Sequence, residues 1–311
     1  MTLSILILLA GLALLYYGSS LLVEGAASTA IMFAVRPVIV GLTVVSLATS
    51  APELLVSLVA AVKGSEGISL GNILGSNVIN IALVLGASAL IKPVSVSQRV
   101  TRIELPYMIV ISIIFWVLCL DNQISRIDGI ILISLLALFL GYGLATASDK
   151  SASGGSNIDR TPLKILKNIA YVIAGIVMLA YGANFVVKEA IEMAQNIGLS
   201  QTFIGISVVA LGTSLPELAT SVVAASRGES DISVGNVVGS NLFNICLVMG
   251  VVGMFNPMVV EPSLHKFEFP FMLFICLALG GTAWLKGGVG KRSGSLFIAL
   301  FFVFIILSYL K

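Results

Sequence analysis

The chain has 311 residues, of which 58% are hydrophobic and 10% are charged, and its formal net charge is +2. Soluble domains carry about 25% charged residues, so the excess of apolar side chains is expected to face lipid. The 17 Lys and Arg residues are spread along the chain without forming a basic patch, which excludes a nucleic-acid-binding surface. The three cysteines are widely spaced within apolar runs, so we expect neither a disulfide framework nor a metal knuckle.

Long apolar segments follow one another along the whole chain, and each can cross a bilayer as a helix of about 20 residues. They are residues 3–30, 37–62, 68–91, 103–120, 127–147, 163–187, 202–226, 232–255, 268–285 and 293–310. A Ser/Gly-rich polar linker, 148–162, lies between the fifth and the sixth segment. The pattern predicts an all-α integral membrane protein with ten transmembrane helices, five in residues 1–147 and five in residues 163–311.

The two halves are copies of one another. Aligning residues 41–86 with residues 205–250, at an offset of 164, gives 26 identities in 46 positions without a gap. The alignment includes GLTVVSLATSAPELLVSLVAA against GISVVALGTSLPELATSVVAA, and GNILGSNVINIALVLG against GNVVGSNLFNICLVMG. Because five spans is an odd number, the second copy must enter the membrane from the opposite side. Inverted repeats of this kind are typical of secondary transporters, which bind their substrate near the membrane midplane between the repeats.

The distribution of Lys and Arg predicts the orientation of the chain. With the N-terminus outside the cell, 12 of these residues fall in inside loops and 5 fall outside. The positive-inside rule therefore predicts that both termini are extracellular and that the linker 148–162 is cytoplasmic.

The most informative side chains are two glutamates in the middle of apolar spans. Glu53 and Glu217 each follow a Thr-Ser-x-Pro sequence, and an ionisable group at that depth is costly and is functional by default. No Lys or Arg lies mid-span to neutralise them. Pro52 and Pro216 lack an N–H and clash with the preceding helical turn, so we expect each helix to break there and to expose backbone carbonyl oxygens.

Other polar side chains recur around these glutamates in both copies. They are Thr49, Ser50, Ser76 and Asn80 in the first copy, and Thr213, Ser214, Ser240 and Asn244 in the second. Together they offer carboxylate, hydroxyl, amide and carbonyl oxygens, which suit Na⁺, Mg²⁺ and Ca²⁺. The alternative is that the hydroxyls and amides only hold helices together. No His or Cys flanks the glutamates as an enzyme would require, so we assign no catalytic residues and no cofactor.

The duplicated blocks resemble the α-repeats of the calcium/cation antiporter superfamily, and specifically its sodium/calcium exchanger branch. The pattern G-T-S-x-P-E, followed by G-N-x-x-G-S-x-x-x-N, occurs in both halves, with Ala48 in place of the first glycine in the first copy. The resemblance implies exchange of Na⁺ for Ca²⁺ by alternating access, with three Na⁺ per Ca²⁺ and net movement of charge. It also implies a ligand set, which is Glu53, Glu217, Thr49, Thr213, Ser50, Ser214, Asn80, Asn244, Ser76 and Ser240, with the backbone carbonyls of Ser46 and Ala210.

The resemblance also bears on the coupling ion and on the location. The chain has asparagine at both position 80 and position 244. In this respect it is more similar to potassium-independent exchangers, because some relatives carry Asp at the position of Asn244. Coupling to H⁺ or K⁺ remains an alternative, and a cation channel is a further one. The short linker leaves no room for a large cytosolic domain, which favours a prokaryotic cell membrane. We expect the chain to function as a monomer. Glycines spaced by seven residues on the first and sixth helices, such as Gly11, Gly18 and Gly175, are expected to let these helices pack closely and slide.

Overall fold

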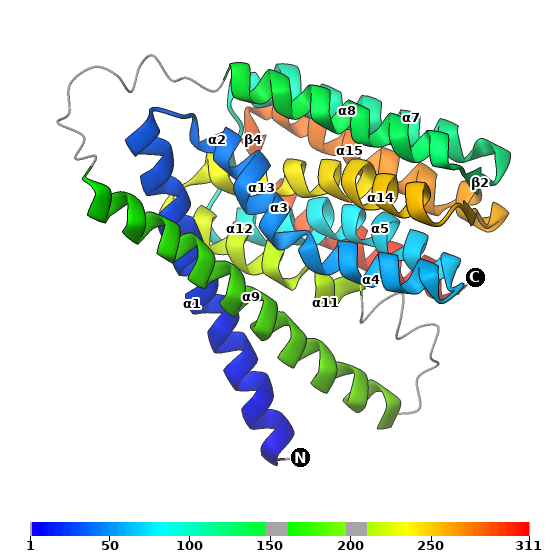
Figure 1. The fold of residues 1–311 in the computed structure, drawn as a ribbon, viewed down its shortest axis with the longest axis horizontal. Helices are drawn as coiled ribbons and strands as arrows, with labels where there is room; N and C mark the ends of the chain where they lie inside the picture. The colour runs from blue at the N-terminus through cyan, green and yellow to red at the C-terminus, as the bar shows by residue number, and fades with distance from the viewer. Residues whose placement is uncertain (1, 147–160, 197–209, 311) are drawn as a thin grey trace.

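The computed structural model describes residues 2–146, 161–196 and 210–310. Within these ranges the chain is almost entirely helical, and the crossed helices α1 (Thr2–Phe33) and α9 (Pro162–Asn196) project from a bundle formed by the others (Figure 1). The all-α class expected from the sequence is confirmed. Apart from its last two residues, the expected linker 148–162 lies outside the described ranges.

Several of the long helices pass through a wide π-helical turn without interruption. After α1 the first half contains α2 (Pro37–Val40), the π-helix η1 (Gly41–Val45), α3 (Ser46–Thr49), α4 (Ala51–Val62), α5 (Glu66–Ile79), the π-helix η2 (Asn80–Leu85), α6 (Gly86–Ile91), the π-helix η3 (Val100–Glu104), α7 (Leu105–Leu118), the 3₁₀-helix η4 (Cys119–Asp121) and α8 (Arg126–Ala145). After α9 the second half contains α11 (Ala210–Thr213), α12 (Leu215–Arg227), α13 (Ser230–Leu242), the π-helix η6 (Phe243–Val248), α14 (Met249–Phe255), the 3₁₀-helix η7 (Pro262–Lys266), α15 (Glu268–Lys286) and α16 (Lys291–Tyr309).

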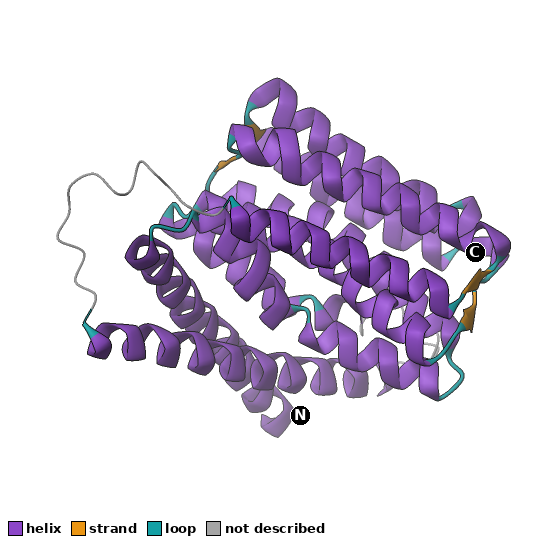
Figure 2. Ribbon diagram, turned by 45° about the horizontal axis from the view of Figure 1, so that its top comes forward, coloured by secondary structure: helices purple, strands orange, loops and turns teal. Residues whose placement is uncertain are grey.

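Four strands of two residues each connect the ends of helices, and Figure 2 shows them as short segments at the edge of the bundle. β1 (Val94–Ser95) pairs antiparallel with β4 (Gly288–Val289), and β2 (Gln123–Ile124) pairs antiparallel with β3 (Met258–Val259). Each pair therefore joins one half of the chain to the other. The sequence did not predict them, because two residues are too few to show the alternation by which strands are recognised.

The described residues include eight helices that are long and apolar enough to cross a membrane. A ninth span is obtained if Pro37–Thr49 and Ala51–Val62, which meet at an angle of 43°, are counted together. The expected span 202–226 begins in residues outside the described ranges. The membrane-spanning character is confirmed, and the exact number of ten stays a prediction.

Burial divides the spans into a central and a peripheral group. In Glu66–Ile91 and in Ser230–Phe255, 83% of the most apolar stretch is buried inside the protein. The corresponding fraction is 28% in both α8 and α16. Large apolar side chains cover the exposed surface of the peripheral helices, as expected for contact with lipid.

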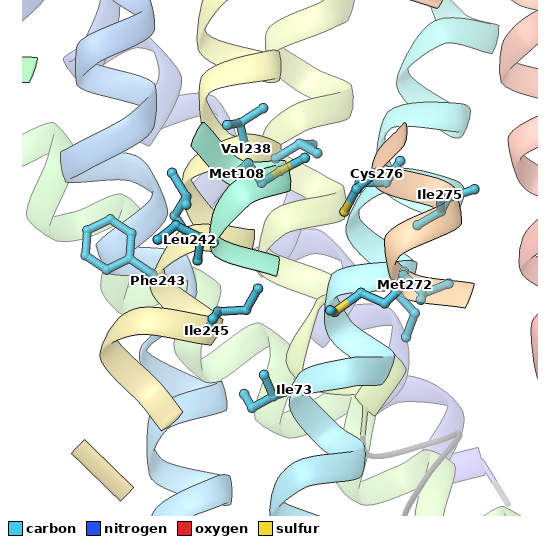
Figure 3. Close-up of a cluster of buried hydrophobic side chains, with 14 of the residues drawn as sticks. Ile73, Met108, Val238, Leu242, Phe243, Ile245, Met272, Ile275 and Cys276 are labelled. Carbon is cyan, nitrogen blue, oxygen red and sulfur yellow. The ribbon is translucent and has the colours of Figure 1, made fainter. Parts of the chain in front are cut away.

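An apolar cluster packs the central spans together (Figure 3). It draws side chains from α5, α7, α13, η6 and α15, including Ile73, Met108, Val238, Leu242, Phe243, Ile245, Met272, Ile275 and Cys276. Met108 and Met272 are separated by the repeat offset of 164 residues. The cluster therefore surrounds the interface of the two halves and holds its polar residues in fixed positions.

The α1–α9 crossing depends on glycine. A Cβ atom on Gly175 would lie 2.7 Å from the carbonyl oxygen of Gly18, and one on Gly182 would lie 2.9 Å from that of Gly11. No larger residue fits there without moving a helix backbone. The close packing expected from these glycines is confirmed, and the sliding of the two helices stays a prediction.

Candidate functional site

The two glutamates lie directly after matching breaks in two helices. Ser50, between α3 and α4, has φ −84° and ψ 4°, and Ser214, between α11 and α12, has φ −85° and ψ 4°. Proline follows two residues later in both cases, and because it has no N–H it cannot bond the carbonyl of the preceding turn. The expected breaks are therefore present. They place Glu53 and Glu217 in the first turns of α4 and α12, and both side chains are fully buried.

Each glutamate is contacted by the serine of the opposite break. Ser50 Oγ donates to Glu217 Oε1 at 3.2 Å, and Ser214 Oγ donates to Glu53 Oε1 at 3.3 Å. Ser240 Oγ also donates to Glu217 Oε1, at 3.3 Å. Ser50 lies three residues before Glu53 in the sequence, a spacing that puts two residues on the same face of a continuous helix. The structure places it against the other glutamate, because the chain turns at Ser50 and the two breaks meet.

The second oxygen of each carboxylate has no hydrogen-bond partner in the described part of the chain. This applies to Glu53 Oε2 and Glu217 Oε2, and also to the buried hydroxyl of Ser76. Neither glutamate forms an ion pair with a described residue. Burying such groups without a partner is costly, so the arrangement is suited to binding a cation.

Two asparagines on the neighbouring spans, Asn80 and Asn244, also leave a buried oxygen without a hydrogen-bond partner in the described part of the chain. The Nδ2 of Asn80 donates to Asn241 Oδ1 at 3.2 Å, and that of Asn244 donates to Asn77 Oδ1 at 3.3 Å. The Oδ1 atoms of Asn80 and Asn244 are buried and have no partner among the described residues. Asn80 is the first residue of the π-helix η2 and Asn244 is the second residue of the π-helix η6, and such segments are often found at functional sites.

Asn77 and Asn241 are in turn fixed by the apolar cluster. Asn77 Nδ2 contacts Met272 Sδ at 3.6 Å, and Asn241 Nδ2 contacts Met108 Sδ at 3.7 Å. Their oxygens accept from Asn244 and Asn80, so both polar atoms of each amide contact the opposite half. Each of these contacts has a counterpart at the repeat offset.

Two further asparagines position the threonines of the site. Thr49 Oγ1 donates to Asn236 Oδ1 at 3.2 Å, and Thr213 Oγ1 donates to Asn72 Oδ1 at 3.3 Å. Asn236 also donates to Ser221 Oγ at 2.9 Å. We had not predicted a role for Asn72 and Asn236. The available signal was their occurrence as the second residue of G-N-x-x-G-S in both copies.

The structure leaves the expected carbonyl ligands engaged in helical bonds. The carbonyl oxygen of Ser46 accepts from the N–H of Ser50 at 2.9 Å and from Thr49 Oγ1 at 3.4 Å. That of Ala210 accepts from the N–H of Ser214 at 3.3 Å and from Thr213 Oγ1 at 3.1 Å. The side chain of Ser46 bonds backbone carbonyls, including that of Asn236 at 3.1 Å, so it does not point into the site.

The donor set is entirely oxygen. The described residues contain no group of three or more His, Cys, Asp or Glu that could hold a metal ion, which agrees with a site of two carboxylates completed by neutral oxygens. Hydroxyl, amide and carboxylate oxygens suit hard cations. The arrangement places oxygen atoms that suit such an ion between two halves of one chain.

Comparison with known proteins gives a family match over nearly the whole chain. The model of the family described as sodium/calcium exchanger protein matches residues 3–144 and again residues 167–310. The chain is 34% identical to the inner membrane protein YrbG of Escherichia coli, covering 99% of this chain and 98% of that protein. It is 29% identical to the sodium/calcium exchanger MaX1 of Methanosarcina acetivorans, covering 89% and 90%.

Solved structures show the same fold. The sodium-calcium exchanger NCX_Mj, soaked with 10 mM Na⁺ and no Ca²⁺, superposes with a TM-score of 0.87 at 32% identity, and the match covers 98% of each chain. The same exchanger soaked with 2.5 mM Na⁺ and 0.1 mM Ca²⁺ gives a TM-score of 0.86.

Proposed function

The chain belongs to the sodium/calcium exchanger protein family, and from this premise we propose that it exchanges Na⁺ for Ca²⁺ across the membrane by alternating access. The observation that carries the proposal is the exchanged contact between the halves, in which Ser50 bonds Glu217 and Ser214 bonds Glu53. Each carboxylate keeps one oxygen without a partner in the described part of the chain. A cation bound there contacts both repeats at once, so movement of the repeats changes its access to solvent.

The charge of the site favours a divalent ion or several monovalent ions. Two buried carboxylates carry two negative charges in a region of low dielectric constant, and one Ca²⁺ neutralises them. Ca²⁺ takes six to eight oxygens. In our proposal they come from Glu53, Glu217 and the backbone carbonyls of the two breaks, and Na⁺ binds the same carboxylates together with Thr49, Thr213, Ser50, Ser214, Ser76, Ser240, Asn80 and Asn244.

The carbonyls of Ser46 and Ala210 remain part of this proposed ligand set. Each already accepts hydrogen bonds within its own break, but a carbonyl oxygen has two lone pairs and the bonds from the threonine hydroxyls are exchangeable. We therefore propose that cation binding turns the hydroxyls of Thr49 and Thr213 away from these carbonyls.

We further propose ten spans in two inverted repeats, 1–147 and 163–311, with both termini outside and the linker 148–162 inside. The two stretches matched by the family model support this division, and the two strand pairs that join the halves support a two-fold arrangement. Single cysteines placed at positions 156 and 263, in a background lacking the native cysteines, are expected to label from opposite sides of the membrane.

The direct test of exchange is Ca²⁺ flux in proteoliposomes containing the purified full chain. An outward-directed Na⁺ gradient is expected to drive Ca²⁺ uptake against its own gradient, whereas K⁺ or H⁺ gradients of the same size are not. Flux that only dissipates the Ca²⁺ gradient would show a channel. Uptake driven by K⁺ or H⁺ instead would assign the chain to a different branch of the superfamily.

The proposed stoichiometry of three Na⁺ per Ca²⁺ moves one charge in each cycle, worth about 2.3 kcal/mol per 100 mV. Expulsion of Ca²⁺ driven by inward Na⁺ should therefore accelerate when the interior is negative. Clamping the potential with valinomycin at a fixed Na⁺ gradient measures this dependence. A rate and an end point independent of voltage would show electroneutral exchange of two Na⁺.

A further inference from the structure

A cavity of about 500 Å³ lies away from the ion site, where α15 ends and α16 begins. The strand pair β1–β4 forms part of its wall, at the edge of the bundle marked by β4 in Figure 1. Three cationic side chains line it, those of Lys286, Lys291 and Arg292, and all three are exposed. No carboxylate lines the cavity, and none of the three cations forms an ion pair with a described residue. The cavity is therefore strongly positive.

The backbone around the cavity supplies hydrogen-bond donors. Gly290 is the N-cap of α16, a helix of 19 residues, and no side chain caps this helix end. The carbonyl of Gly290 accepts from the N–H of Gly294 at 2.8 Å. The N–H groups of the first turn that precede Gly294 have no partner within the helix, and the helix dipole adds positive potential at this end.

A buried side chain at the same place independently indicates a ligand. Ser293 lines the cavity, and its side chain is only 7% exposed. Its hydroxyl makes no hydrogen bond to any described residue, and its oxygen remains accessible from the cavity. The group belongs to the first turn of α16 and is available to a ligand in the cavity.

The last helix of the other half shows how the chain itself satisfies such a helix end. At the start of α8, Ser125 accepts from the N–H of Asp128, and the carboxylate of Asp128 accepts from the N–H of Ser125 at 2.8 Å. A carboxylate of the protein thus occupies the N-terminus of α8. At α16 the corresponding turn carries cations and a cavity in place of the carboxylate.

We propose that this cavity binds a phosphate group, held by Lys286, Lys291 and Arg292, by the backbone N–H groups of the first turn of α16 and by the Ser293 hydroxyl. The phosphate belongs either to the headgroup of an anionic phospholipid or to a free phosphate ion. The location fits a membrane surface, because Trp284 and Leu285 directly before the cavity are 78% and 75% exposed, and exposed Trp is typical of the membrane–water interface.

The test uses Trp284 as a reporter in the full-length chain. The chain has two tryptophans, so Trp116→Phe leaves Trp284 alone, two residues before Lys286. In phosphatidylcholine vesicles, phosphatidylglycerol with brominated acyl chains is expected to quench Trp284 more strongly than the same amount of brominated phosphatidylcholine. In purely phosphatidylcholine vesicles, the emission of Trp284 is recorded while inorganic phosphate replaces chloride at equal ionic strength. Selective quenching assigns the phosphate to a lipid, and a saturable response to inorganic phosphate assigns it to the free ion.

Three variants test whether the cavity causes the preference for the phosphate-bearing ligand. The double change Lys291→Gln and Arg292→Gln should weaken the preference by about fivefold for each charge removed. Ser293→Ala removes no charge, but it should weaken binding by about tenfold or more through loss of one hydrogen bond to a charged group. The matched control, Arg126→Gln at the start of α8, should leave the preference unchanged.

The proposal fails if neither ligand produces a response. It also fails if Ser293→Ala leaves the preference intact, because diffuse attraction between lysines and an anionic surface would then explain the result without a cavity site. Native mass spectrometry of the chain with both tryptophans gives a second readout that does not depend on Trp116→Phe. A retained phospholipid or phosphate adduct should disappear in the Lys291→Gln, Arg292→Gln protein.

Discussion

The two halves of the molecule agree at the ion site and differ in how the crossed helices contact them. At the site, most contacts of one half recur in the other with partners exchanged, as for Ser50 with Glu217 and Ser214 with Glu53. The exception is Ser240, which bonds Glu217, whereas the hydroxyl of its counterpart Ser76 has no partner among the described residues. Away from the site, α1 packs along α12, where Arg227 donates to the carbonyl of Ser20 at 3.0 Å and to its hydroxyl. In the described ranges no comparable packing joins α9 to α4, the equivalent helices.

From this difference we propose which part of the structure moves during transport. Symmetric contacts bury the carboxylates from both sides and hold them in the apolar cluster. The α1–α9 pair lies closer to one half, so it breaks the symmetry that the site preserves. In the proposed cycle, alternating access corresponds to moving this pair from one half to the other while the site stays between them.

The largest effect is expected from removing either carboxylate. Glu53→Gln and Glu217→Gln each leave one charge to bind a divalent ion in a buried site, which should weaken Ca²⁺ binding by about a hundredfold or more. Sodium-driven Ca²⁺ uptake in proteoliposomes should be lost in both variants, with Glu261→Gln in an exposed loop as the control. Full activity in one of the two would show that the symmetric contacts do not reflect a symmetric function.

A smaller effect is expected at the crossing of α1 and α9. Gly175→Ala places a methyl group against the backbone of Gly18 and should reduce stability by about 1–3 kcal/mol. Gly141→Ala on α8 meets nothing within 4 Å, so it should be neutral or stabilise by up to about 1 kcal/mol. Thermal unfolding in detergent compares the two variants. Equal stability would mean that the two helices do not approach each other this closely in solution.

A third comparison concerns the asparagines that position the threonines. Asn72→Ala frees Thr213, and Asn236→Ala frees Thr49, while both carboxylates remain. Each loss should raise the Na⁺ concentration for half-maximal exchange by about tenfold, corresponding to one lost buried hydrogen bond. The apparent affinity for Ca²⁺ should change less, because its main ligands in our proposal are the carboxylates. Equal changes for both ions would indicate a general loss of structure.

The sequence predicted much of this arrangement, because its signals are local or duplicated. The spans follow from apolar length, the breaks from Pro52 and Pro216, and the site from the polar residues that recur at the repeat offset. The partners within the site were not predictable from spacing. Ser50 lies three residues before Glu53 but bonds Glu217, because contacts between the halves depend on how two helix breaks meet in space. Asn72 and Asn236 were overlooked for the same reason, since they act through threonines of the opposite half.

The smallest effect is expected where the two halves differ. Arg227 bonds α1 at an exposed position. Lys63, which occupies the equivalent position at the end of α4, is exposed, and its side chain makes no hydrogen bond to a described residue. If α1 and α9 move during transport, the Arg227–Ser20 contact stabilises only the conformation seen here. A contact present in one conformation shifts the equilibrium by at most its own free energy, about 1 kcal/mol or fivefold for an exposed pair.

Arg227→Gln should therefore change the apparent Ca²⁺ affinity measured from one side of the membrane by up to about fivefold, with an opposite change from the other side. Lys63→Gln should alter neither, which flux assays in vesicles of defined orientation can measure. Matching changes in both variants would show that the asymmetry between the halves does not bias the transport cycle.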